Sequence, residues 1–67
     1  MITTQEMTGL PSIAGHYGIQ YPDHGATPLV VPAGTELREL SWLSPDNGWK
    51  AYAWSKESKL VVVWIQS

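Results

Sequence analysis

Residues 49–67 read WKAYAWSKESKLVVVWIQS, and this stretch decides the fold. Two runs rich in apolar residues flank the polar segment Lys56–Lys59, which predicts a β-hairpin. We centre its loop on Glu57–Ser58, because a two-residue loop fixes the register of the strands on either side. In this register Trp54 faces Val61, and the same register determines the other cross-strand pairs.

Both faces of this hairpin are apolar. One face carries Tyr52, Trp54, Val61, Val63 and Ile65, and the other carries Trp49, Ala51, Ala53, Leu60, Val62 and Trp64. An antiparallel sheet with one solvated face would place polar residues on one side. The hairpin must therefore be covered on both sides, by the rest of the chain, by a second copy or by a different protein.

Turn signals built from proline, glycine, asparagine and aspartate recur at short intervals in the remainder of the chain. They leave segments of strand length, and we predict strands over Tyr17–Tyr21, Thr27–Val31 and Glu36–Leu43. The segment Tyr17–Tyr21 would show Tyr17, Ile19 and Tyr21 on one face. Together with the hairpin, these segments predict an all-β fold: a small antiparallel barrel or roll of about five short strands, in a single domain over residues 1–67.

Two further features refine this prediction. Thr3 and Glu6 have the spacing of a capping box, which favours a helical turn or two over residues 3–10 before Pro11 stops it. The proline-glycine turns followed by short strands resemble SH3-like barrels in outline. This resemblance implies architecture alone, because fold does not determine function.

The composition excludes several classes of protein. The chain has no cysteine, which rules out disulfides, thiolate metal sites and thiol catalysis. Its net charge is −2 with the two signs interspersed, so a phosphate backbone finds no basic surface and nucleic-acid binding is disfavoured. The first residues lack the pattern of a signal peptide, and no apolar run approaches the length of a membrane span. We therefore expect a cytoplasmic protein without membrane contact.

Self-association is expected from the size of the chain. A domain of 67 residues is near the lower limit for independent folding, and this one has no disulfide to help. The last strand, Leu60–Ile65, is apolar on both faces. We therefore predict a homo-oligomer, most simply a dimer, that assembles through this strand by a two-fold contact.

Candidate catalytic groups are sparse. His16, His24 and Asp23 are residue types that bind metals or transfer protons, but the two histidines are at opposite ends of a predicted strand. The serines lack the sequence context of a nucleophile. We therefore predict that the protein is not an enzyme and that it uses no metal and no cofactor.

The aromatic residues are the main compositional excess, with four tryptophans and three tyrosines. Rings with a polar tip suit surfaces that are half buried and half in contact with a partner. We expect Trp64 and Trp42 in the core, and Trp49 and Trp54 exposed beside turns. The predicted partner- or ligand-binding residues are Trp49, Trp54, Tyr52, Arg38 and Lys50.

Two functions compete for these residues. The first is a small non-catalytic binding protein that docks on a larger, unidentified protein through an aromatic surface, as a modulator or inhibitor. The alternative is a homo-oligomer that binds a small ligand or nucleotide between subunits, with an aromatic ring stacked on the ligand and Arg38 or Lys50 on an anionic group.

Overall fold

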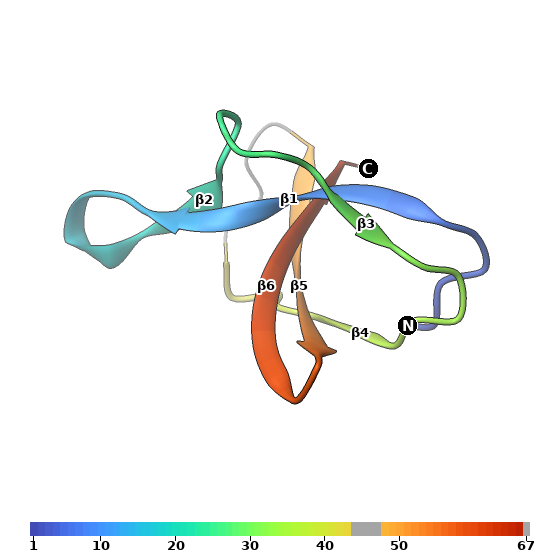
Figure 1. Cartoon of the computed structure of the whole chain (residues 1–67). Coiled ribbons are helices and arrows are strands. Elements are labelled where there is room, and N and C mark those ends of the chain that lie inside the picture. The colour runs from blue at the N-terminus through green and yellow to red at the C-terminus, as the bar shows by residue number, and fades with distance from the viewer. Residues whose placement is uncertain (44–47, 67) are drawn as a thin grey trace.

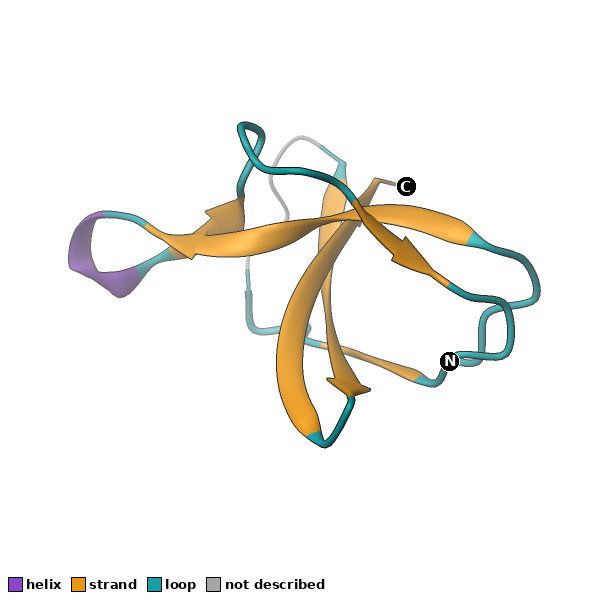
Figure 2. Ribbon diagram, viewed as in Figure 1, coloured by secondary structure: helices purple, strands orange, loops and turns teal. Residues whose placement is uncertain are grey.

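A computed structural model describes residues 1–43 and 48–66 of the protein. It contains six strands and one short 3-10 turn (Figures 1 and 2). In chain order they are β1 (Met7–Ala14), η1 (His16–Gly18), β2 (Gln20–Pro22), β3 (Leu29–Val31), β4 (Leu37–Glu39), β5 (Trp49–Lys56) and β6 (Lys59–Gln66). No helix in the described ranges is long and apolar enough to cross a membrane.

The strands form one antiparallel sheet in the order β2-β1-β6-β5-β4, and β3 also pairs with β1. The all-β antiparallel fold predicted from the sequence is therefore confirmed. The predicted barrel is not, because β4 at one end of the sheet does not pair with β2 or β3 at the other. β1 instead crosses over the β5–β6 hairpin, as Figure 1 shows, and continues beyond it.

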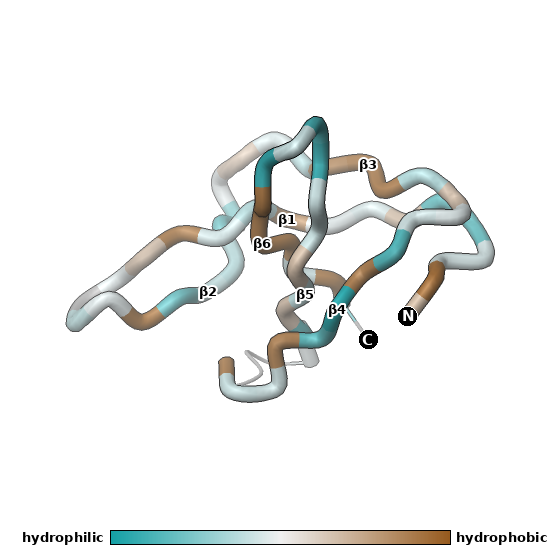
Figure 3. Tube along the Cα trace, turned by 90° about the horizontal axis from the view of Figure 1, so that it is seen from below, coloured by the Kyte–Doolittle hydropathy of each residue, from teal (hydrophilic) through white to brown (hydrophobic). Residues whose placement is uncertain are grey.

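The hairpin itself has the predicted register. Trp54 pairs with Val61, and the ladder runs without a break from Trp49↔Gln66 to Lys56↔Lys59. The loop residues Glu57 and Ser58 both have positive φ, 50° and 65°, as a two-residue type I′ turn requires. Figure 3 shows a hydrophilic loop at the end of a hydrophobic β6.

The helical turn predicted over residues 3–10 is absent, and Met7–Gly9 belongs to β1 instead. Thr3 does not cap a helix. Its hydroxyl donates a hydrogen bond to the Pro32 carbonyl at 2.9 Å and accepts one from the Thr35 amide at 3.0 Å. This buried side chain hydrogen-bonds the backbone of the turn between β3 and β4, so long-range hydrogen bonds replace the predicted capping interaction.

The shorter predicted strands are only partly correct. Within Tyr17–Tyr21, Gly18 has φ 73° and Tyr17 has φ 61°, so the chain turns at η1 before β2 begins at Gln20. Strands exist within Thr27–Val31 and Glu36–Leu43 but cover three residues each, as β3 and β4. The turn predicted at residues 44–48 lies largely outside the described residues.

The first face of the hairpin is covered by the chain itself. Val31, Leu37, Trp54, Val63 and Ile65 form a buried inner cluster, against which Met7, Leu29, Tyr52 and Val61 pack. Of the expected two-fold interface along Leu60–Ile65, Val63, Trp64 and Ile65 are buried within one chain, whereas Leu60 is exposed. The homo-oligomer itself stays a prediction.

The crossing of β1 over β6 requires a glycine. A Cβ at Gly9 would lie 2.5 Å from Val63 Cγ2 and 2.9 Å from the Trp64 carbonyl oxygen. The second neighbour is backbone and cannot rotate away. We infer that this contact fixes how closely the N-terminal strands approach the hairpin.

Replacement of Gly9 by alanine should consequently destabilise the protein by about 1–3 kcal/mol, the usual effect of overpacking. Gly25→Ala is the matched control, because the nearest atom to its Cβ would be 3.7 Å away. Urea unfolding of the two variants measures the difference. Equal urea midpoints would show that the β1–β6 contact adjusts to an added methyl group without loss of stability.

The hairpin loop offers a stabilising change. Glu57 and Ser58 adopt a conformation that asparagine and glycine adopt with less strain. We expect Glu57→Asn combined with Ser58→Gly to raise the free energy of unfolding by about 1 kcal/mol. Ser55→Gly, within β5, should lower it instead. A double variant less stable than the natural chain would contradict the type I′ assignment.

Candidate functional site

The second face of the hairpin is only partly covered. Leu40, Ala51 and Trp64 form a buried outer cluster, against which Leu43, Trp49, Ala53 and Val62 pack. Leu40 is held over this face because its amide donates to the Ala51 carbonyl at 2.9 Å. Beyond the cluster, towards the hairpin loop, Leu60 is 76% exposed.

A groove of about 570 Å³ lies on this uncovered part of the face. We call it the outer groove, and its lining consists of Gln20, Arg38, Leu40, Trp42, Leu43, Ala53, Leu60 and Val62. The lining is mostly aliphatic and aromatic. Among the described lining residues Arg38 is the one that carries a charge, and Gln20 belongs to β2. This composition suits the burial of an apolar group with a single polar contact.

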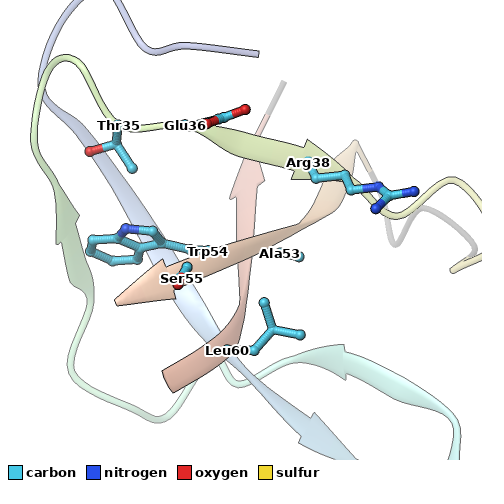
Figure 4. Close-up of a pocket in the computed structure, with 7 residues that line it drawn as sticks. All are labelled: Thr35, Glu36, Arg38, Ala53, Trp54, Ser55 and Leu60. Atoms are coloured by element: carbon cyan, nitrogen blue, oxygen red, sulfur yellow. The ribbon is translucent and has the colours of Figure 1, made fainter. Parts of the chain in front are cut away.

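A second hollow of about 470 Å³ adjoins the outer groove and shares Arg38, Ala53 and Leu60 with it. Figure 4 shows its walls, in which the Trp54 indole lies beneath Thr35 while the Arg38 side chain points away from that ring. Arg38 pairs with Ala53 across β4 and β5, and both residues line both hollows. The uncovered face is thus continuous from Thr35 to Trp42.

The predicted site residues are placed unequally. Arg38 is exposed and lines the outer groove, whereas Lys50 is exposed over a smaller hollow of about 90 Å³ that shares Leu40 and Leu43 with the groove. Tyr52 is half buried against the inner cluster. Trp49 is half buried against the outer cluster and makes an edge-to-face contact with His24, with ring centroids 5.6 Å apart. The structure therefore does not bring these five residues into one site.

The expected exposure of Trp54 is wrong, because only 7% of this residue is exposed. Its pairing with Val61 and Leu37 turns the indole into the inner cluster. The ammonium of Lys56 lies 5.2 Å from the ring centroid and covers part of what remains. Trp54 is a core residue that also forms part of a hollow's wall.

The expectation for Trp42 is wrong in the opposite sense, since it is 72% exposed, whereas Trp64 is fully buried as expected. Trp42 follows β4 after the ladder with β5 has ended, so no strand covers it. Trp42 is a functional candidate that the sequence reasoning missed, and Leu60 was predicted only as part of the two-fold contact along the last strand. A signal for Leu60 existed in the register, because it pairs with the polar Ser55 at the solvated end of the hairpin.

Asp23 and His24 are not among the residues that line the outer groove. No cluster of three histidine, aspartate or glutamate residues suited to a metal occurs within residues 1–43 and 48–66. The side chain of His16 lies outside the described part of the chain. His24 stands over Trp49, away from the outer groove. The geometry favours an apolar contact surface as the site.

Comparison of the chain with protein-family models, with curated proteins and with solved structures found no match. The site is therefore interpreted from its own geometry.

The burial of Trp54 and the exposure of Trp42 can be tested by replacing each residue with alanine. Trp54→Ala should destabilise the protein by about 3–5 kcal/mol, because it empties part of the inner cluster. Trp42→Ala should change the free energy of unfolding by less than about 1 kcal/mol, because its ring is exposed. Urea titrations followed by circular dichroism measure both. A larger loss for Trp42→Ala would place that ring in a core.

Proposed function

We propose that this protein is a non-catalytic binding module that docks on a larger protein through the outer groove and thereby modulates it. The observation that carries the proposal is the exposure of Trp42 and Leu60 around an apolar groove. Contiguous apolar surface of this kind on a small protein usually marks an interface. Aromatic and arginine side chains are also the residue types that contribute most to protein–protein affinity.

The distribution of charge supports the same function. Arg38 lines both hollows, and Glu36, which directly precedes β4, lines one of them. A charge beside an apolar centre orients a partner more than it adds affinity. A partner segment with an apolar side chain for the groove and a carboxylate for Arg38 would fit this arrangement.

A small-ligand function is the second candidate, because Trp42 and Arg38 line the same groove. An indole and a guanidinium together could hold a planar anionic molecule such as a nucleotide. Thermal-shift measurements with a panel of nucleotides test this. A shift that Trp42→Ala abolishes would favour the ligand, and the absence of any shift favours the protein partner.

The docking function is tested by capture of partners on immobilised protein. Leu60→Lys should reduce the captured partner by about tenfold or more, since it places an ammonium in the apolar centre of the interface. Val30→Lys is the matched control, because Val30 is also exposed, at 54%, but lies on β3 outside the groove lining.

Both variants should keep the melting temperature of the natural chain, because both side chains are exposed. Quantitative mass spectrometry of the captured material compares the three proteins. Equal capture by the natural chain and Leu60→Lys would contradict docking through the outer groove. Loss of capture in Val30→Lys alone would place the interface on β3 instead.

A further inference from the structure

The end of β1, the turn η1 and β2 form an arm that projects from the rest of the molecule (Figures 1 and 2). Ile13 pairs with Tyr21 and Ala14 with Gln20, and the Gly15 amide donates to the Ile19 carbonyl at 2.7 Å. The arm is thus an ordered two-stranded hairpin. Such hairpins are only marginally stable in water when nothing covers them.

The tip of this arm displays an aromatic side chain in a strained conformation. Tyr17 is 100% exposed, and its backbone has φ 61°, a value that bulky residues rarely adopt. The strained backbone leaves the ring fully exposed, so the strain does not improve packing within the monomer. Backbone outliers of this kind often mark contact sites, where the strain serves to present a side chain.

The rest of the arm is apolar and free of carboxylates, lysine and arginine. Ile13, Ile19 and Tyr21 are exposed beside Tyr17, and Figure 3 shows hydrophobic positions on both sides of the arm. Within residues 13–21 the only residue type that ionises near neutral pH is the histidine at position 16. A surface that covers the arm therefore needs to be apolar and nearly uncharged.

The outer groove meets this requirement and adjoins the arm at Gln20, which pairs with Ala14 just before the turn. Gln20 of β2 lines the groove, and its carbonyl Oε1 accepts a hydrogen bond from Ser12 Oγ at 2.6 Å. Tyr17 precedes Gln20 by three residues, across the turn at Gly18. Two chains related by a two-fold axis could therefore each place the tip of the arm in the other subunit's groove.

We propose that the outer groove is occupied by the arm of a second copy of this chain, so that the protein forms a two-fold dimer in which each Tyr17 inserts into the other subunit's groove. This inference rests on the proposed function, because it names an occupant of the same groove. The ring of Tyr17 packs between Trp42 and Leu60, and Arg38 lies over its face or against its hydroxyl. The contact is isologous and therefore closes at two subunits.

The exposed surface is large enough for such a dimer. Six side chains contribute, namely Ile13, Tyr17, Ile19 and Tyr21 of the arm and Trp42 and Leu60 of the groove. Covering all six would remove on the order of 800 Å² of exposed surface per chain, which is about the area per partner in a stable interface. We expect a dissociation constant in the micromolar range, given the small number of polar contacts.

Sedimentation equilibrium of the natural chain and three variants tests the dimer. Tyr17→Asn removes the ring and places a residue that tolerates positive φ at the tip. We expect this variant, like Leu60→Lys, to raise the dissociation constant of the dimer at least tenfold. Val30→Asn, outside both arm and groove, should leave it unchanged.

Several results would overturn the proposal. A natural chain that stays monomeric up to about 100 µM forms no such dimer. A dimer that survives both Tyr17→Asn and Leu60→Lys assembles through another surface. A fall in the melting temperature of Tyr17→Asn under monomeric conditions would assign the ring a role within one chain. Circular dichroism at low concentration provides that comparison.

Cross-linking tests the contact directly, since the chain has no cysteine of its own. Chains carrying Ile19→Cys on the arm and Ser41→Cys beside the groove are mixed, with tags of different size, and oxidised. The proposal expects the mixed disulfide to form in preference to either symmetric one. Predominance of the Ile19→Cys symmetric product would show that arms meet arms and would overturn the insertion into the groove.

The two proposals fail separately. If the natural chain is monomeric but captures a partner through Leu60, only the dimer proposal is refuted. If the dimer forms with the expected cross-link but captures no partner, only the proposal of docking on a larger protein is refuted. Where both hold, Tyr17→Asn captures more partner than the natural chain at micromolar concentration, because its groove is free.

Discussion

The close approach of β1 and β6 at Gly9 is the contact on which the rest of the fold depends. Only a residue without a Cβ lets the backbone of one strand pass within van der Waals distance of the Trp64 carbonyl. This approach brings Met7 and Leu29 onto the inner cluster, so one face of the hairpin is sealed without a second subunit. The remaining strands are too short to reach the other face as well.

This shortage explains where the candidate site lies. A hairpin with two apolar faces needs two covers, and the chain provides one cover and part of another. Leu40 and Leu43 shield Trp64, but the face stays open near Leu60. The proposed interaction surface thus arises from incomplete coverage of the core. In such a protein, residues that stabilise the fold and residues that bind are neighbours on the same strand.

The parts of the structure that depend on local pattern could be predicted. The loop at Glu57–Ser58 determined the register of the hairpin, and the register divided its side chains between two clusters correctly. The parts in which a turn or a long-range contact overrides the local pattern could not. Alternation over Tyr17–Tyr21 indicates a strand, but the two positive φ angles at Tyr17 and Gly18 form a turn there instead.

The site was predictable to a smaller extent. Arg38, predicted as a cation for an anionic group, lines the outer groove, whereas Tyr52 packs against the inner cluster. Trp54 and Trp42 were interchanged, since proximity to a turn does not reveal which face another strand will cover. The arm was missed as a surface for the same reason.

The position of the hairpin in the chain also affects how the protein is made. β1 pairs with β2 and β3, which follow it soon in the sequence, but its contact with β6 spans about fifty residues. During synthesis the N-terminal strands therefore emerge with their apolar side chains uncovered, and they stay so until β6 is complete. Open edges of this kind attract other strands. The nascent chain should thus depend on rapid closure of the hairpin, and a slow codon or a pause before residue 60 would favour aggregation over folding.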